Sequence, residues 1–333
     1  MRAMKDQFAR EISYMRVSVT DRCNLRCVYC MPEEGVPCVS HSDILSYDEI
    51  TRVCRIGSGL GIRKIKLTGG EPLVRRGLPG LVRMIKSLPD IDEVTLTTNG
   101  ILLKSQLDDL VAAGLDAVNI SMDTLDPEEY GRITRTGTVQ DVLDGLEAAL
   151  SCGKLKVKIN CVPLQNIPAE TYVRLAMLAK DRPLDVRFIE MMPIGLGSRF
   201  RGRSSGELMA LLEDRFGKAE PDSAKHGNGP AVYCSFPEFS GKIGLISAMT
   251  HQFCGTCNRV RLTSEGMLKL CLQYQTGVDI RALLRSGADD DRIRETMRRA
   301  VYEKPACHHF ERAGSAAETI REAETRDMSQ IGG

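Results

Sequence analysis

Three cysteines lie within eight residues near the N-terminus, at Cys23, Cys27 and Cys30, with C-x3-C-x2-C spacing. Thiolates suit soft metals, and iron–sulfur clusters of the cubane type are normally held by four of them. Three ligands leave one iron without a protein donor, as a catalytic zinc site leaves one position open. Zinc is the weaker alternative because it prefers paired C-x2-C knuckles. The spacing therefore predicts a cluster whose open iron binds a substrate or cofactor.

A second group of three cysteines lies in the C-terminal third, at Cys254, Cys257 and Cys271. His251 precedes the group by three residues, so a zinc site completed by this histidine is the alternative to a second cluster. Arg259 and Arg261 share one face if their segment is a strand. Two guanidiniums beside a metal site favour an anionic ligand such as phosphate, whereas a solvated strand face is the alternative.

Polar groups follow the predicted strands at several points. Thr68-Gly69-Gly70-Glu71-Pro72 places a carboxylate after two glycines, which are expected to let the backbone approach a ligand closely. Asn99, Ser121 and Asp123 end two further strands, where they serve either as ligand hydrogen bonders or as helix caps. The sequence therefore predicts ligand contacts at one edge of a sheet.

The segments between these residues alternate between strand and helix patterns, which predicts βαβ units and a parallel sheet. The expected strands of the first part are 14–20, 63–67, 93–97, 116–121, 155–162 and 185–190. Ser46 and Glu49 form a capping-box pattern, and predicted helices over 102–113 and 139–152 end at glycines. Six units are too few for a closed barrel, so we expect an incomplete (βα)6 TIM-type barrel with its site at the C-terminal strand ends.

The pattern changes near residue 195, which predicts a barrel over 1–195 and a smaller C-terminal α+β region over 196–333. Residues 195–202 and 221–230 are expected to be loops. Strands are expected over 242–248, 259–263 and 267–272, and helices over 278–286 and 291–303. The polar end of the chain is expected to fray by default.

Composition narrows the class of protein. The chain has 333 residues and a net charge of +1, so bulk charge predicts no nucleic-acid or membrane partner. No signal peptide and no apolar run long enough to cross a bilayer are found in the sequence. Without an export signal, the 12 cysteines predict metal binding in a reducing cytoplasm.

The first cysteine motif, with Tyr29 before its last cysteine, and the Gly-Gly-Glu-Pro turn together resemble the radical S-adenosylmethionine (SAM) enzymes. The resemblance implies that a 4Fe–4S cluster on Cys23, Cys27 and Cys30 reduces SAM at its open iron. It also implies a set of SAM-binding residues, Tyr29, Gly70, Glu71, Ser121 and Met192.

The second cysteine group followed by Asn-Arg-x-Arg, together with the terminal Gly332-Gly333, resembles the GTP 3′,8-cyclase family of molybdenum cofactor biosynthesis. This implies a second 4Fe–4S cluster on Cys254, Cys257 and Cys271 and a catalytic set of Arg16, Arg259 and Arg261. The implied GTP contacts are Arg16, Lys64, Lys66, Thr97, Lys158, Arg187, Arg259, Val260 and Arg261. Lys66 departs from the family, where arginine is common and offers a two-pronged fork.

Basic side chains on buried strands need anionic partners. The alternative is that several of these side chains face solvent.

The resemblance implies a lyase reaction in which a 5′-deoxyadenosyl radical abstracts the 3′ hydrogen of GTP and C3′ then bonds to C8. It implies an electron donor such as flavodoxin or ferredoxin, a downstream cyclic pyranopterin monophosphate synthase, and a monomer or homodimer whose double-glycine end reaches the active site. Another two-cluster radical SAM enzyme, for example one that modifies peptides, and a zinc-stabilised binding protein without catalysis remain alternatives.

Overall fold

The computed structural model describes residues 3–37, 39–224, 226–310 and 323–332. Its centre is one sheet with the strand order β12-β11-β10-β1-β2-β3-β4-β5-β6-β9-β8-β7. Every neighbouring pair from β10 to β9 is parallel, and both outer ends of the sheet are antiparallel. The two edge strands, β7 and β12, do not pair with each other among the described residues. The fold is therefore an open, incomplete TIM-type barrel, as predicted.

The strands are three to six residues long. The first six are β1 (Tyr14–Ser18), β2 (Lys64–Thr68), β3 (Glu93–Thr98), β4 (Ala117–Ser121), β5 (Lys156–Cys161) and β6 (Asp185–Ile189). The others are β7 (Glu220–Asp222), β8 (Val232–Ser235), β9 (Ile243–Ile246), β10 (Arg259–Leu262), β11 (Met267–Lys269) and β12 (Gly277–Asp279). All six strands expected in the first part are present, with ends that differ by one or two residues.

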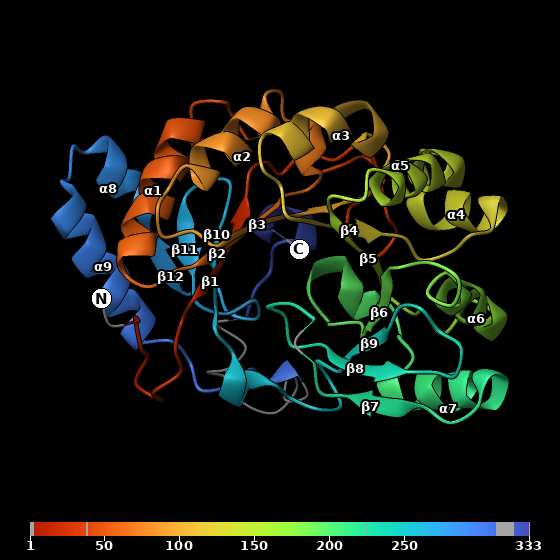
Figure 1. Ribbon diagram of the computed structural model, residues 1–333. Coiled ribbons are helices and arrows are strands. Elements are labelled where there is room, and N and C mark those ends of the chain that lie inside the picture. The colour runs from red at the N-terminus through yellow and green to blue at the C-terminus, as the bar shows by residue number, and fades with distance from the viewer. Residues whose placement is uncertain (1–2, 38, 225, 311–322, 333) are drawn as a thin grey trace.

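Helices cover the outer side of the arc of strands, except for the short C-terminal helix of residues 328–331, which lies within the arc (Figure 1). They are α1 (Tyr47–Gly59), α2 (Leu78–Lys86), α3 (Leu103–Ala112), α4 (Pro127–Thr134), α5 (Val139–Ser151), α6 (Ala169–Met177), α7 (Ser205–Phe216), α8 (Ile280–Arg285), α9 (Asp290–Tyr302) and α11 (Met328–Ile331). Short 3-10 turns lie at η1 (Pro72–Val74), η2 (Gly195–Arg199) and η3 (Cys254–Thr256). The capping box at Ser46 is confirmed, because its side chain accepts from the Glu49 N–H and the Glu49 carboxylate accepts from Ser46.

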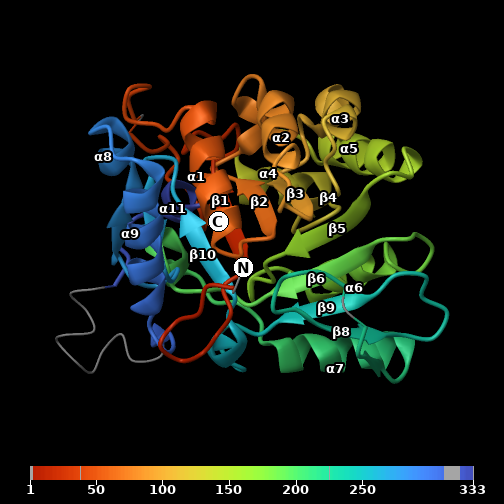
Figure 2. The same cartoon turned by 60° about the vertical axis from the view of Figure 1, so that its left-hand side comes forward.

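The C-terminal region does not form a separate sheet. Its strands β9 and β10 extend the two sides of the barrel in parallel, and helix α9 packs beside α1 (Figure 2), where Arg52 pairs with Asp290. Within the segment expected to be a loop, residues 221–222 belong to β7, which is an edge strand too short to show periodicity. The helix expected from residue 278 begins instead at Ile280, because Val278 pairs with Leu268 and Asp279 caps the helix.

Side chains on the parallel strands alternate between the helices and the interior of the arc. On β1, Met15 and Val17 are 0% exposed in the main core, whereas Arg16 faces a central cavity. The same alternation places Ile65 of β2 in the core and Lys66 in the cavity. This period of two residues gives one apolar and one polar face to each strand.

The C-terminal end of the described chain is ordered, which overturns the default expectation of a frayed end. Residues 328–331 form α11, and Ile331 is 0% exposed against Ile194 and Phe310. Gly333 and Cys38 lie outside the described residues. Among the described residues, no helix combines the length and apolar character needed to cross a membrane.

Candidate active site

One cavity of about 820 Å³ fills the interior of the arc of strands. It is lined by all six cysteines of the two groups and by the positions expected to bind SAM: Tyr29, Gly70, Glu71, Ser121 and Met192. It is also lined by the cationic and hydroxyl positions expected to bind GTP: Arg16, Lys64, Lys66, Thr97, Lys158, Arg187, Arg259 and Arg261. Val260 is the exception, because its side chain is 1% exposed in the main core on the opposite face of β10.

The first cysteine group lies on the loop after β1. Its backbone folds into a tight turn in which the Cys30 N–H donates to the Cys27 carbonyl at 2.9 Å. Cys23 Sγ accepts from the Leu25 N–H at 3.4 Å and from Asn99 Nδ2 at 3.9 Å. These contacts point all three thiols into the cavity.

Burial makes these thiols hard to ionise without a metal. It raises the pKa of Cys23 to about 11, with the Glu71 carboxylate adding to the effect. It raises the pKa of Cys30 to about 12, with Cys23 and Asp327 as further causes. The pKa of Cys27 is also raised well above its usual range, mainly by burial. A metal that neutralises the thiolates would remove this penalty.

The Gly-Gly-Glu-Pro turn packs directly against the cysteine loop. A Cβ on Gly69 would lie 2.5 Å from the Thr20 carbonyl oxygen, and one on Gly70 would lie 2.4 Å from that of Arg22. The Gly70 N–H donates to Thr20 and the Glu71 N–H to Arg22, each at 2.7 Å. The glycines make room for the backbone of the cysteine loop, and both also line the cavity, so the expected close approach of a ligand stays a prediction.

Glu71 is the buried carboxylate at the end of β2. It accepts hydrogen bonds from Thr98 Oγ1 at 2.7 Å, from the Asn99 N–H at 2.6 Å and from the Leu73 N–H at 2.9 Å. Burial nevertheless raises its pKa to about 7, against the lowering effect of these donors. A cationic ligand beside this carboxylate would favour its ionised form.

Asn99 and Asp123 do not cap helices. Helix α3 begins after Leu102 and α4 is capped by Asp126. Asp123 instead accepts from the Tyr29 hydroxyl at 2.5 Å and from the Val162 N–H at 2.8 Å, which fixes the aromatic ring of the first cysteine motif beside β4. The capping alternative is therefore wrong for both residues.

The second cysteine group lies at the opposite wall of the cavity, on η3 and after β11. Cations surround it: Arg259 stacks over the Phe253 ring at 4.9 Å, and its Nη2 lies 3.9 Å from Cys257 Sγ. Burial opposes ionisation of the Cys257 thiol, but Lys304 and Arg259 outweigh it and lower the pKa to about 7. Lys304 is itself buried and donates to the Leu270 carbonyl.

An N-terminal arginine holds the second group in place, and the sequence patterns did not single it out. Arg10 Nη1 donates to the carbonyls of Cys254 at 2.7 Å and Ala306 at 2.8 Å, and its Nη2 donates to that of Pro305 at 2.6 Å. Its Nε pairs with Asp6 at 2.5 Å, and both side chains are almost fully buried. The i,i+4 spacing of Asp6 and Arg10 was the available signal, but it is common on exposed helices and points to no carbonyl partner.

Strand pairing brings the basic side chains into rows across the cavity. In one row Arg16 of β1 is paired in register with Arg261 of β10 on one side and with Lys66 of β2 on the other. In the next row Tyr14 stands between Arg259 and Lys64. The expected shared faces are therefore confirmed, because side chains of one row in a parallel sheet point the same way.

Burial and neighbouring cations lower the pKa values of Lys66 and Arg261. Burial lowers the pKa of Lys66 well below its usual range, and Arg187 and Arg16 lower it further. Burial, Arg16 and Arg259 lower the pKa of Arg261 to about 9. Among the described residues, no carboxylate forms an ion pair with Lys66, Arg187, Arg259 or Arg261. Such a cluster is stabilised by a bound polyanion.

In the part of the chain that the structure describes, carboxylates pair with the cavity cations Lys64 and Lys158, which lie toward the N-terminal end of their strands. Lys64 lies 3.7 Å from Glu93, and Lys158 lies 2.7 Å from Asp185. The loop after β7 covers this end, because Asn228 contacts both Lys64 and Glu93. The uncompensated positive charge is therefore concentrated in the middle of the cavity and near the second cysteine group.

The cysteine groups can also be compared with the geometry of a single-ion site. No group of three or more His, Cys, Asp or Glu side chains in the described chain converges tightly enough to hold one metal ion. Thiolates of a cubane cluster bind different irons and stand farther apart than ligands of one zinc. His251 is exposed and its Nδ1 contacts Thr250 Oγ1, so it does not complete a zinc site with the second group.

Two protein families match parts of the chain. The family described as "Radical SAM superfamily" matches residues 17–179, and "Molybdenum Cofactor Synthesis C" matches residues 184–310. Relatives named GTP 3′,8-cyclase are similar over almost the whole chain. The relative from Heliobacterium modesticaldum is 45% identical over 333 residues, and that from Clostridium perfringens strain 13 is 42% identical over 330 residues. Both matches cover 99% of this chain and 100% of the relative.

Solved structures are similar in fold. Streptococcus suis SuiB bound to S-adenosylmethionine matches with a TM-score of 0.63 and 15% sequence identity, over 89% of this chain and 64% of SuiB. The same protein bound to its precursor peptide SuiA matches with a TM-score of 0.61. At this identity the likeness concerns the open barrel and not the reaction.

Proposed function

The chain belongs to the GTP 3′,8-cyclase family of the radical SAM superfamily, and we propose that this reaction takes place in the central cavity between the two cysteine groups. The reaction converts GTP into (8S)-3′,8-cyclo-7,8-dihydroguanosine 5′-triphosphate, the first step of molybdenum cofactor biosynthesis. Membership of the family implies SAM and an iron–sulfur cluster. A second cluster, the roles of individual residues and the partners are proposals.

One observation carries the assignment of roles within the cavity. The cavity is lined by Lys66, Arg187, Arg259 and Arg261, which form no ion pair with a carboxylate among the described residues, and burial and neighbouring cations lower the pKa of Lys66 and of Arg261. A triphosphate supplies several anionic oxygens to such a cluster, and guanidinium groups bind phosphate in two-pronged fashion. This arrangement supports GTP as the ligand, with its phosphates along the strands and its base toward the second cysteine group.

We assign SAM to the opposite wall. When bound by Cys23, Cys27 and Cys30, a 4Fe–4S cluster supplies the electron that cleaves SAM. The Glu71 carboxylate accepts a hydrogen bond from the methionyl ammonium of SAM. The resulting ion pair offsets the cost of burying the ionised carboxylate. Ser121 lies exposed at the end of β4, where its hydroxyl can reach the SAM carboxylate, and Met192 lies beside the space for adenine.

We assign a second 4Fe–4S cluster to Cys254, Cys257 and Cys271, where an open iron would bind the guanine base. Lys304 and Arg259 keep the thiol of Cys257 easy to ionise, whereas burial raises the pKa of Cys254 in the same group. Arg16, Arg259 and Arg261 are the side chains that hold the substrate during cyclisation. Thr97 lies on the same wall and accepts from Asn119 Nδ2 at 3.4 Å, which leaves its hydroxyl proton for the ligand.

The partners follow from the same reaction. An electron donor of the flavodoxin or ferredoxin kind supplies the reducing equivalent, and cyclic pyranopterin monophosphate synthase consumes the product. We propose a monomer or homodimer, and we retain the division of the chain near residue 195 as a prediction.

Anaerobic turnover tests the proposal. The purified protein, reconstituted with iron and sulfide, is incubated with SAM, dithionite and either GTP or ATP, and the products are identified by mass spectrometry. We expect about eight irons per chain and a cyclic product from GTP only. About four irons per chain would reject the second cluster. 5′-Deoxyadenosine without a product derived from GTP would reject the substrate and favour a different radical SAM reaction.

A further inference from the structure

The C-terminal segment of residues 323–332, here called the tail, reaches both cysteine groups. The backbone of Ser329 lies close to the Cys30 thiol of the first group. The carbonyl of Gly332 accepts from Nη1 of Arg261, which lies beside the second group. In Figure 1 the C-terminal end lies at the centre of the arc of strands. Correct placement of the tail therefore affects both walls of the cavity.

Apolar contacts hold the tail only weakly. Ile331 belongs to a cluster with two other buried residues, Ile194 and Phe310, which is separate from the main core. Asp327 adds one hydrogen bond, accepted from the Leu196 N–H at 3.1 Å. So small a cluster buries little apolar surface, so polar contacts must supply much of the docking free energy.

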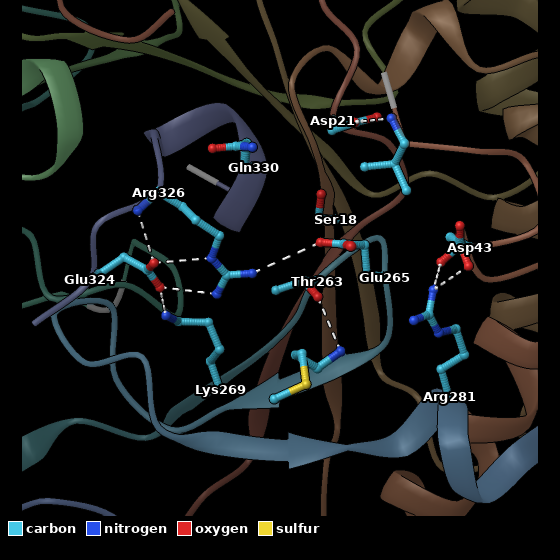
Figure 3. A network of polar contacts seen from close by, with 12 residues as sticks. Ser18, Asp21, Asp43, Thr263, Glu265, Lys269, Arg281, Glu324, Arg326 and Gln330 are labelled. Atoms are coloured by element: carbon cyan, nitrogen blue, oxygen red, sulfur yellow. Dashed lines mark hydrogen bonds and ion pairs between the residues drawn. The ribbon is translucent and has the colours of Figure 1, made fainter. Parts of the chain in front are cut away.

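A buried ion network supplies such contacts at the start of the tail (Figure 3). The Glu324 carboxylate accepts from Lys269 Nζ, and the side chains of both residues are fully buried. The same carboxylate accepts from Nε and Nη2 of Arg326, each at 3.0 Å. The Glu324 N–H also donates to the Gln273 carbonyl at 2.6 Å. Glu324 is therefore the single anion between two cations, one on the body of the protein and one on the tail.

The position of Lys269 connects this network to the substrate cations. Lys269 lies on β11 and is paired in register with Arg261 on β10. It is also two residues before Cys271. Strand β11 therefore contacts the start of the tail through Lys269, and its neighbour β10 contacts the end of the tail through Arg261. The network and the Arg261–Gly332 contact fix the two ends of the tail on one rigid pair of strands.

We propose that Glu324 is a positioning residue for cyclisation, which fixes the tail to β11 through Lys269 while Arg326 orients its carboxylate, so that Gly332 holds Arg261 in its orientation toward the substrate. The proposal rests on the proposed function, because it assigns Arg261 to GTP. It assigns Glu324 no contact with substrate or cofactor. Loss of the carboxylate would leave two cations together without their shared anion and would release the tail.

The variant Glu324→Gln tests this role because it keeps the shape of the side chain and removes its charge. Loss of a buried charged hydrogen bond changes an equilibrium by about ten- to a hundredfold, so protease cleavage within the tail should increase by about that factor. The amount of 5′-deoxyadenosine formed per cyclic product should rise, because SAM cleavage continues while cyclisation fails. Iron content and SAM cleavage without GTP should stay at the wild-type level.

Two further variants keep the test decisive. Arg326→Gln changes only the tail side of the network and leaves the Lys269–Glu324 pair in place, so it should give a smaller change of the same kind with an intact fold. Glu265→Gln is the matched control, because Glu265 lies 3.9 Å from Arg326 but its side chain is 35% exposed. Exposed ion pairs contribute little, so this control should behave as wild type.

Wild-type protease resistance and a wild-type ratio of 5′-deoxyadenosine to cyclic product in Glu324→Gln would overturn the proposal. If Glu324→Gln loses iron through misfolding, the same two measurements on Arg326→Gln decide. Absence of any cyclic product from the wild-type protein would reject the proposed function instead, and tail protection in the variants would then still decide whether Glu324 docks the tail.

Discussion

The two cysteine groups offer the same three thiols to the same cavity in opposite electrostatic surroundings. The first group faces the carboxylates Glu71, Asp123 and Asp327, and burial together with these anions keeps its thiols protonated. The second group faces Arg259 and Lys304, which lower the pKa of Cys257 to about 7 despite burial. One wall thus favours a cationic ligand and the other an anionic one.

This difference in charge gives a physical reason why one cavity can bind two charged molecules, each at its own wall. SAM carries a sulfonium and an ammonium, which fit the wall with carboxylates, and GTP carries a triphosphate, which fits the wall with cations. Interactions between charges are strong in a buried site, so misplacing either ligand would bring like charges together. We expect the charge of each wall, rather than its cysteines, to distinguish the two proposed binding sites.

The two groups also differ in how they are held. The first is fixed locally, by the loop after β1 and the glycine turn beside it. The second is fixed by distant segments, namely Arg10 from the N-terminus and the turn at residues 304–306. Damage to remote residues should therefore affect the second group far more than the first.

Replacing one cysteine in each group is the strongest test of the comparison. Cys23→Ala should abolish reductive SAM cleavage, because the cluster on the first wall is lost. Cys271→Ala should leave SAM cleavage largely in place and mainly damage substrate binding and cyclisation. Iron content, 5′-deoxyadenosine and cyclic product are measured for both variants. Equal loss of SAM cleavage in the two variants would contradict the division of roles.

Removing Gly332 and Gly333 tests whether the tail serves the second wall. We expect cluster content and SAM cleavage to remain nearly intact while cyclic product disappears, because Arg261 loses its contact with the Gly332 carbonyl. A milder variant is Gly332→Ala: its φ of 77° is unfavourable for alanine, and a Cβ would lie 2.9 Å from Ser18 Cβ. A truncated protein that forms product at the wild-type rate would show that the tail has no such role.

Arg10→Ala tests the remote attachment of the second group. The change leaves Asp6 buried and unpaired, which should cost about 3–5 kcal/mol of folding free energy, and it removes the donor to the Cys254 carbonyl. We expect iron to fall from about eight to about four per chain while SAM cleavage persists. Iron analysis and denaturant unfolding are the measurements.

Two variants control this experiment. Arg10→Lys keeps the charge beside Asp6 but cannot reach several carbonyls at once, so it should retain stability better than iron. Lys5→Ala changes an exposed residue of the same segment and should behave as wild type. Unchanged iron content in Arg10→Ala would show that the second group is held without the arginine.

Arg261→Ala sharpens the assignment of the anionic ligand, because it removes the guanidinium together with its contact to the Gly332 carbonyl. Loss of a buried charged hydrogen bond weakens binding by about ten- to a hundredfold, so the affinity for GTP should fall by that factor while the affinity for SAM changes little. Arg299→Ala, at a side chain that is 82% exposed, is the control. Anaerobic binding measurements that give equal GTP affinity in Arg261→Ala and wild type would remove this role.

Local signals in the sequence were sufficient for much of the fold and the chemistry. Thiol spacing identifies the first cysteine group, because its three cysteines lie on one short loop, whereas Cys271 reaches Cys254 and Cys257 only through the antiparallel pairing of β10 and β11. Alternation within strands placed Lys64 with Lys66 and Arg259 with Arg261 on shared faces, since the side-chain period of a strand is fixed by its backbone. The capping box at Ser46 is equally local.

Only the tertiary structure decided which distant residues meet. No periodicity links Arg10 to the carbonyl of Cys254, or Glu324 to Lys269, because these contacts join segments that are far apart in the chain. Likewise, Gly69 and Gly70 follow a strand as a ligand loop would, yet their missing side chains serve the approach of the backbone at Thr20 and Arg22. The sequence by itself determined the donor groups and the strands that carry them; packing decided their neighbours and hence the charge of each wall, since electrostatic effects depend on distance and burial rather than on order along the chain.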